Sequence, residues 1–283
     1  FGEPWLPAPL ILSSPGANWL PMRPYGPCSV GTITAAVLAC NNEDIIARCL
    51  KSVAWADQTL VILDDRSSDR TAEISEGLGA RVVAHRFANF ADQRNFGFEQ
   101  AATEWLFYID SDEEATEALG REIRLVTGAA AHAGWWVPRR NFIWGRETRH
   151  GGWYPDYQMR LYRVTCARYD PEHPVHEVVR LEGSAGYLKE PLIHHNYASI
   201  EQFRAKQHQY VELEARQRLK AGIRPRPWTR YAQPLREFWR HYVRLQGYRD
   251  GWHGLKLCTL VAYYYGYAVT ARLSQLLATE ESQ

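Results

Sequence analysis

The sequence predicts an α/β protein with a mostly parallel sheet covered by helices on both faces. Short apolar runs alternate with amphipathic stretches between residues 31 and 126, which is typical of parallel strands joined by helices. Acidic turns follow two of these runs, where an open parallel sheet places its ligands. Of the 283 residues, 46% are hydrophobic and 23% are charged, so a folded protein is expected and a disordered chain is excluded.

The first part of the chain is expected to hold four strands and four helices. Strands are predicted where apolar and β-branched residues form short runs, at 32–39, 60–63, 80–84 and 105–109. Helices are predicted where apolar residues recur at helical spacing, at 43–53, 68–76, 90–101 and 117–126. Ser68 or Asp69 should cap the second helix and Asn89 the third, because short polar side chains accept hydrogen bonds from the free N–H groups there.

The pattern changes after residue 134. Residues 134–196 are aromatic and strand-like, with turn signals such as Gly151-Gly152, and they predict antiparallel strands that complete the domain. From Ser199 the pattern is helical, and Ser199 with Gln202 resembles a capping box. Two more helices are predicted, at 234–245 and 254–277.

Three regions follow from these patterns. Residues 1–30 hold 7 of the 15 prolines and are expected to form an arm laid across the domain surface. Residues 31–198 form the main α/β domain, with one half at 31–115 and a second at 116–198. Residues 199–283 form a C-terminal helical region.

Charge and cysteine content exclude some classes of protein. A formal charge of +1 gives no global positive field, so no nucleic-acid partner is expected, although residues 201–256 hold 13 basic and 5 acidic side chains. The five cysteines are scattered and include no Cys-x-x-Cys pair, which argues against a disulfide framework and a zinc ribbon. A reducing compartment, the cytoplasm, is therefore expected.

Residues 257–271 are uncharged and rich in tyrosine. This run is shorter than the about 20 residues needed to cross a bilayer, so a membrane span is not expected. Two interpretations stay open. The run could lie peripherally on the anionic inner face of the cytoplasmic membrane, with neighbouring Arg and Lys side chains on the headgroups. It could equally be a helix packed on the domain with a solvated basic face.

Two aspartates, Asp110 and Asp112, follow the strand predicted at 105–109. Since ligands of open α/β sheets bind beyond the carboxyl ends of the strands, these side chains are expected at the ligand site. Paired carboxylates can share one hard cation, and Mg²⁺ or Mn²⁺ held this way keeps positions open for diphosphate oxygens. The alternative for so short a motif is a charged turn without a ligand.

A second acidic turn, residues 64–71, follows the strand predicted at 60–63. One interpretation is a helix cap with a charged first turn. The other is a set of acceptors for a nucleobase or a ribose, because this turn would lie at the same edge of the sheet. The two acidic turns together indicate a ligand site more specifically than either turn alone.

These motifs together resemble family 2 glycosyltransferases with the GT-A fold. The nucleotide-sugar half is similar through Cys40-Asn41-Asn42-Glu43, Asp64-Asp65-Arg66-Ser67-Ser68-Asp69-Arg70-Thr71, Phe90-Ala91-Asp92-Gln93-Arg94-Asn95 and Asp110-Ser111-Asp112-Glu113. The remainder resembles the bacterial branch that includes lipopolysaccharide-core glucosyltransferases, through His150-Gly151-Gly152-Trp153-Tyr154-Pro155-Asp156-Tyr157-Gln158-Met159-Arg160-Leu161, Val175-His176-Glu177, Pro191-Leu192-Ile193-His194 and Asp250-Gly251-Trp252. The resemblance covers about residues 31 to 277.

The resemblance implies inverting transfer of a sugar from a nucleoside diphosphate donor, foremost a uridine diphosphate sugar, with Mg²⁺ or Mn²⁺. The acceptor would be a hydroxyl of a glycan, a glycolipid or a small molecule. Residues 31–115 would bind the nucleotide sugar, and residues 116–198 the acceptor. The donor-binding residues implied are Asn41, Glu43, Asp65, Arg66, Gln93, Arg94, Asp110, Ser111 and Asp112.

A carboxylate is implied as the base that deprotonates the acceptor hydroxyl. Glu177 is the expected base because it stands in the family's His-Glu pair, and Asp156 is the second choice. His194 would join Asp110 and Asp112 at the metal or would be a core histidine. Acceptor contacts are implied for Trp153, Tyr154, Arg160 and His176.

One residue departs from the family's usual Asp-x-Gly-Ser-x-Asp motif, since Arg66 replaces the glycine. Glycine permits positive φ and close approach of backbone to ligand. Arg66 therefore either gives the turn another conformation or adds a cation to the donor pocket, and an altered donor preference is the hypothesis.

Two other functions compete with this interpretation. A nucleotidyltransferase would need a glycine-rich phosphate loop near the first strand, and residues 40–43 do not provide one. A catalytically silent scaffold or membrane-surface binding protein is favoured only by Arg66 and by the basic, aromatic C-terminal region. The presence of Asp110, Asp112 and Glu177 argues against it.

Overall fold

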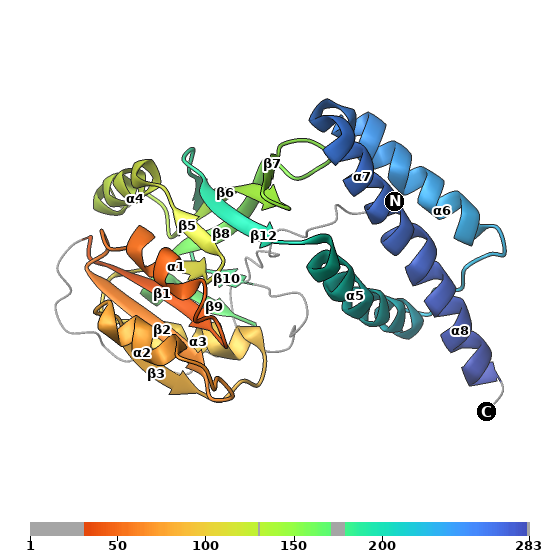
Figure 1. Ribbon diagram of the computed structural model, residues 1–283. Helices are drawn as coiled ribbons and strands as arrows, with labels where there is room; N and C mark the ends of the chain where they lie inside the picture. Colours follow the sequence, from red (N-terminus) through yellow and green to blue (C-terminus); the bar gives the residue numbers. More distant parts are fainter. Residues whose placement is uncertain (1–30, 130, 171–178, 282–283) are drawn as a thin grey trace. The chain divides into compact units, whose positions relative to one another are not determined.

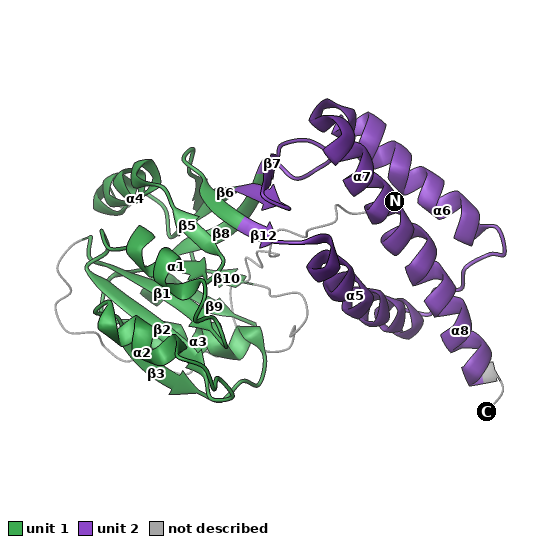
Figure 2. Ribbon diagram, in the orientation of Figure 1, with its two compact units in different colours: residues 1–139, 156–194 green, residues 140–155, 195–283 purple. Residues whose placement is uncertain are grey.

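The computed structural model describes residues 31–129, 131–170 and 179–281. The arm expected at 1–30 lies outside the described residues, as do His176 and Glu177. The described chain divides into two compact units, shown in green and purple in Figure 2. Unit 1 comprises residues up to 139 and 156–194, and unit 2 comprises residues 140–155 and 195 onward.

The sheet of unit 1 follows the predicted alternation of strands and helices (Figure 1). The first strands and helices are β1 (Ile33–Ala39), α1 (Ile46–Ser52), β2 (Gln58–Asp64), α2 (Thr71–Gly77), β3 (Arg81–His85), α3 (Phe90–Gln100) and β4 (Trp105–Asp110). Those that follow are β5 (Glu113–Ala115), α4 (Glu117–Ala129), β6 (Gly134–Ile143), β8 (Asp156–Arg163), β9 (Ala167–Tyr169), β10 (Val179–Leu181), β11 (Ala185–Tyr187) and β12 (Leu192–Tyr197). The division between the units falls within β6 and β12.

The sheet has the order β3-β2-β1-β4-β8-β6-β12-β5, with β11 and β7 (Arg146–Thr148) paired to β6. β3, β2, β1 and β4 run parallel, whereas β8 pairs antiparallel with both β4 and β6. β9 and β10 form a separate antiparallel pair. The predicted fold class, a mostly parallel GT-A-like sheet completed by antiparallel strands, is confirmed.

The side chains of β1 explain why the sheet is covered on both faces. Ile33, Ala35 and Val37 pack with α1 and α4 in one buried cluster, whereas Ala36 points to the opposite face and packs with α3. Successive side chains of a strand alternate between faces, so a run with no polar side chain pointing outward must be buried on both. This is why β1 reads as a continuous apolar segment.

Two of the three predicted helix caps agree with the observed helix starts. Asn89 caps α3 by accepting a hydrogen bond from the Asp92 N–H, as predicted. Ser199 caps α5 through Gln202, as predicted. The start predicted for α2 was early, because Asp69 accepts hydrogen bonds from the Thr71 N–H and hydroxyl and the helix begins only at Thr71.

Unit 2 is mainly helical. Its helices are α5 (Ile200–Lys220), α6 (Thr229–Phe238), a π-helical turn at Trp239–Arg244, a short 3₁₀ turn at Gly247–Asp250, α7 (Gly251–Val261), a π-helical segment at Ala262–Ala268 and α8 (Val269–Glu281). The helix predicted to start at Pro234 instead begins at Thr229 and holds Pro234 inside it. Pro234 packs closely on Gly266, where a Cβ would lie 2.4 Å from the Pro234 Cα.

The apolar run at 257–271 is largely a core segment of unit 2. Leu257, Val261, Tyr264 and Val269 are all buried. In the described part of the chain, no helix is long and apolar enough to cross a membrane. Of the two interpretations of this run, the burial fits a helix packed within its own unit.

Candidate active site

The carboxyl ends of three neighbouring parallel strands bring the predicted donor residues together. β1 lies between β2 and β4, with Leu38 opposite Asp110 and Ala39 opposite Leu63. The loops that leave these strands therefore emerge at one edge of the sheet, where ligands of such sheets bind.

The loops after β1 and β2 are joined by hydrogen bonds. The Asn41 N–H donates to Ser67 Oγ at 3.0 Å, and Asn41 Oδ1 accepts from the Ser68 N–H at 2.9 Å. Glu43 Oε2 accepts from the Arg70 N–H at 3.0 Å. Asn41 has a left-handed backbone (φ 52°), which asparagine tolerates better than most residues. Asn41 and Glu43 thus lie beside the acidic turn.

Arg66 is held against Asp64 within this turn. Its backbone N–H and its Nε each lie 2.9 Å from Asp64 Oδ1, and its guanidinium lies 4.8 Å from the centre of the Phe87 ring. The hydrogen bond from Arg66 lowers the pKa of Asp64 to about 2, against the opposing effect of burial. Arg66 does not have positive φ, so the turn has a conformation that does not need glycine.

Asp65 and the helix α3 complete the expected donor side. Asp65 is exposed, and its N–H donates to the His85 carbonyl at 3.3 Å. Gln93 and Arg94 lie buried on α3, and Gln93 Nε2 donates to the same His85 carbonyl at 3.1 Å. Asp65 therefore presents its carboxylate to solvent at the strand edge, whereas Gln93 supports the loop beneath it.

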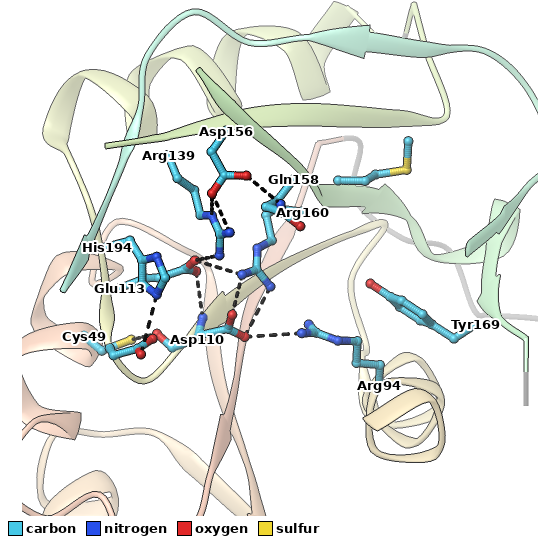
Figure 3. Close-up of polar contacts among 12 residues, drawn as sticks. Cys49, Arg94, Asp110, Glu113, Arg139, Asp156, Gln158, Arg160, Tyr169 and His194 are labelled. Atoms are coloured by element: carbon cyan, nitrogen blue, oxygen red, sulfur yellow. Dashed lines mark hydrogen bonds and ion pairs between the residues drawn. The ribbon is translucent and has the colours of Figure 1, made fainter. Parts of the chain in front are cut away.

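A buried network of charged side chains lies under the Asp110 turn (Figure 3). Arg160 donates to Asp110 and to Glu113 Oε1, the latter at 2.8 Å. Arg94 reaches Asp110 Oδ1 at 3.3 Å from the other side. Arg139 donates to Glu113 Oε1 at 3.2 Å and, through Nη2, to Asp156 Oδ2 at 2.6 Å. We call Arg94, Asp110, Glu113, Arg139, Asp156 and Arg160 the charge network.

The charge network is electrically balanced, with three guanidinium groups and three carboxylates. Partial burial acts to raise the pKa of Asp110, but the charges of Arg160 and Arg94 outweigh it and hold that pKa well below its usual range. The Asp110 side chain is 32% exposed, whereas Glu113 is fully buried. Asp110 is thus the member of the network that presents a charged oxygen to solvent.

Two further contacts hold the backbone of the turn from Asp110 to Glu113. Glu113 Oε2 accepts from the Asp110 N–H at 3.0 Å, and the Cys49 thiol lies 3.4 Å from the Asp110 carbonyl. Ser111 and Asp112, the residues between, are partly exposed. The turn is therefore anchored at both ends and presents its middle to solvent.

Asp112 faces His194 across the β5–β12 pairing. His194 pairs with Glu113 in the sheet, and its Nε2 lies 3.6 Å from Asp112 Oδ2. This separation is short enough for both atoms to contact one cation. Across the described residues no group of three or more His, Cys, Asp or Glu side chains is arranged around a metal position, so these two would need substrate or water oxygens to complete a coordination shell.

Asp110 differs from its expected role at the metal. Its Oδ1 accepts from both Arg94 and Arg160 at 3.3 and 3.2 Å, and its Oδ2 accepts from Arg160. Both oxygens therefore already have cationic partners, whereas Asp112 and His194 lie together. Arg160, expected at the acceptor, is buried and contacts Asp110 and Glu113 instead.

The expected catalytic and acceptor residues fall in different units or outside the described residues. Asp156 is buried, and its two oxygens accept hydrogen bonds from Arg139 and from Gln158. Trp153 and Tyr154 belong to unit 2, where the Trp153 carbonyl accepts from Asn141 Nδ2. Glu177 and His176 lie outside the described residues.

Two members of the charge network, Glu113 and Arg139, were not predicted from the sequence. Arg139 lies in a strand beside Val137, and Arg160 lies between Met159 and Leu161. An arginine that a strand buries needs a carboxylate partner, and the apolar residues near Arg139 and Arg160 were the available signal of burial. The partner was still hidden, because Asp156 is opposite Arg139 only through the strand register.

Proteins of a known family resemble this chain over most of its length. Residues 34–194 match the family described as glycosyl transferase family 2. The chain is 28% identical over 256 residues to the lipopolysaccharide core biosynthesis glycosyltransferase LpsC of Rhizobium meliloti, covering 86% of this chain and 92% of the relative. It is 26% identical over 204 residues to an uncharacterized glycosyltransferase of Rickettsia bellii, covering 68% and 69%.

Among solved structures, the chain is similar to TarS residues 1–349 of S. aureus. The TM-score is 0.42 at 13% identity, over 89% of this chain and 92% of TarS 1–349. The family match covers more than half of the 283 residues and all of the strand ends described above. The chain is therefore a glycosyltransferase that belongs to glycosyl transferase family 2.

Proposed function

We propose that this glycosyltransferase moves a sugar from a nucleoside diphosphate donor to a hydroxyl, with inversion and with Mn²⁺ or Mg²⁺ at Asp112 and His194. The observation that carries the proposal is the 3.6 Å separation of these side chains beside the charge network, at the strand edge where such sheets bind ligands. A divalent cation bound there would neutralise charge on the leaving diphosphate. The imidazole favours Mn²⁺ over Mg²⁺.

Each donor residue has a distinct task in this proposal. Asp110, held ionised by Arg94 and Arg160, accepts a hydrogen bond from a ribose hydroxyl. Asn41, Glu43 and the exposed Asp65 line the nucleoside pocket. A uridine diphosphate sugar is the donor that the family resemblance favours. The contact of Arg66 with Asp64 would change the affinity for the nucleobase of that donor.

We assign the base that deprotonates the acceptor to Glu177 before Asp156. Asp156 Oδ2 accepts two hydrogen bonds from Arg139, which stabilise its charged form and weaken it as a proton acceptor. Arg160 is a positioning residue that orients Asp110. Trp153, Tyr154 and His176 remain proposed acceptor contacts.

The acceptor that we favour is a glycolipid of the cell envelope. Support comes from the similarity to LpsC, whose name places it in lipopolysaccharide core biosynthesis, over 86% of this chain. An acceptor of this kind also fits a cytoplasmic enzyme at the inner face of the membrane. If no glycolipid accepts the sugar, the acceptor would be another glycan or a small molecule.

The test is release of nucleoside diphosphate from a panel of nucleotide sugars, with core glycolipid as acceptor and with Mn²⁺ or a chelator. Asp112→Asn should lower turnover about 100-fold or more, because the cation that neutralises the leaving diphosphate loses its charged protein ligand. The matched control is Glu114→Gln, two residues away, whose carboxylate pairs with Arg48 at 3.0 Å. Equal activity in both variants, or turnover in chelator, would contradict the proposal.

A further inference from the structure

An exposed apolar row runs along α6 in unit 2. Trp228, Tyr231, Leu235 and Trp239 are 60–72% exposed. They are spaced three, four and four residues apart, so they share one face of the helix. Val243 continues the row on the π-helical turn. We call these five side chains the α6 row.

The opposite face of the same helix is the one that packs against its unit. Glu237 and His241 are buried, and Pro234 packs on Gly266 of the long C-terminal helix. Figure 1 shows α6 beside α7 and α8. The helix therefore turns polar side chains and Pro234 toward its own unit, and the apolar row on its other face is exposed.

The surroundings of the α6 row are strongly cationic. Between residues 224 and 249 the only acidic side chain is Glu237, which is buried. The same stretch holds seven arginines, which are Arg224, Arg226, Arg230, Arg236, Arg240, Arg244 and Arg249. A partner that complements an apolar row flanked by arginines is apolar in its interior and anionic at its surface.

We propose that the α6 row docks on an anionic lipid membrane, with the helix lying in the plane of the interface. Trp and Tyr rings are the side chains that settle at the headgroup level of a bilayer. Amphipathic helices with arginines beside an apolar face bind anionic lipids in this way. The helix lies on the surface, since none of the described helices can cross a membrane.

The aliphatic members of the row favour lipid over nucleic acid. Single-stranded nucleic acids bind through aromatic stacking and phosphate contacts. Leu235, the most exposed member at 72%, and Val243 have no part in such binding. An acyl layer accepts all five side chains, so the row as a whole fits a membrane.

The experiment is sedimentation of the full chain with vesicles of phosphatidylcholine alone or mixed with phosphatidylglycerol. The test variant carries Leu235→Ser and Trp239→Ser. The matched control carries Tyr210→Ser and Leu213→Ser on α5, which are 46% and 51% exposed apolar side chains in the same unit. Circular dichroism checks that both variants remain folded.

The expected result is binding to phosphatidylglycerol vesicles that weakens with salt, falls about tenfold or more in the α6 variant and changes less than about twofold in the control. Three outcomes would overturn the proposal. They are no binding by the wild type, equal loss in both variants, and binding of the wild type to single-stranded DNA or an acidic protein that the α6 variant loses while its vesicle binding is unchanged.

Discussion

The carboxylates after β2 and β4 are held in different ways. Asp64, after β2, is bound by Arg66, a neighbour in sequence whose side chain is 64% exposed. Asp110, after β4, is bound by Arg94 and Arg160, which come from α3 and β8 and are almost fully buried. Asp64 is itself buried and has one exposed partner, whereas the partly exposed Asp110 has two buried partners from distant parts of the chain.

This difference indicates which residues can change without loss of the fold. A buried charge that loses its partner is costly, because no water replaces the partner. A surface partner can be removed with little cost, because water and salt already screen the contact. We therefore expect changes at the Asp110 side to affect folding and changes at the Asp64 side to affect recognition.

The largest effect is expected for Arg160→Met. It removes one partner each from Asp110 and Glu113, and Glu113 is fully buried. Breaking a buried ion pair from one side lowers the free energy of unfolding by about 3–5 kcal/mol. Urea denaturation followed by circular dichroism measures this loss.

The control for this prediction is Arg163→Met on the same strand. The Arg163 side chain is 31% exposed and pairs with Glu104 at 3.3 Å, so a loss of about 1 kcal/mol or less is expected. Equal losses in the two variants would contradict the contrast between buried and surface partners.

The next effect concerns the metal. His194→Ala removes one of the two proposed protein ligands, so the concentration of Mn²⁺ that supports half-maximal turnover should rise about tenfold or more. His194→Asp should shift the preference from Mn²⁺ toward Mg²⁺, because a carboxylate replaces the imidazole. His195→Ala is the matched control, and an unchanged Mn²⁺ requirement in His194→Ala would refute the assignment.

A smaller effect is expected for Arg66→Gly, which removes the surface partner of Asp64. The variant should stay folded and bind uridine diphosphate with a changed affinity, because Asp64 becomes accessible and the glycine restores the usual motif. The control is Arg70→Gly, at the N-cap of α2, where glycine is tolerated. The same affinity for uridine diphosphate in wild type and Arg66→Gly would remove the idea of an altered donor preference.

The smallest effect is a change in acid sensitivity. The pKa of Asp64 is about 2 in the folded chain, below its usual value near 4. A lowered pKa stabilises the fold above the unfolded value, and this contribution is lost as pH falls from about 4 toward 2. As the pH is lowered, the urea concentration at the midpoint of unfolding should therefore fall less steeply in Arg66→Gly than in wild type. Parallel plots of this midpoint against pH would contradict the effect of the Arg66 contact.

Much of the fold could be predicted because the strands of the parallel region are apolar on both faces. β1 is apolar apart from the buried Thr34, β4 is apolar up to Ile109, and Asn89 marks a helix start. Pro234 misled the prediction, because proline is typical of a helix start and the tertiary contact with Gly266 is not visible in the sequence.

The candidate site could be predicted only where its residues are local. Asp112 and the turn after β2 follow directly from strand ends. The contact of Arg160 with Asp110 joins residues fifty positions apart, and that of Arg139 with Asp156 depends on the register of β6 and β8. Sequence therefore predicts which side chains reach the edge of the sheet, whereas their ion-pair partners come from the tertiary fold.

The central claim is that Asp112 and His194 bind a divalent cation together with the donor diphosphate. Titration calorimetry of uridine diphosphate with and without Mn²⁺, on wild type and Asp112→Ala, tests it most directly. We expect binding that requires Mn²⁺ and is lost in Asp112→Ala, with the folded state unchanged. Binding of equal strength without Mn²⁺, or retained in Asp112→Ala, would contradict it.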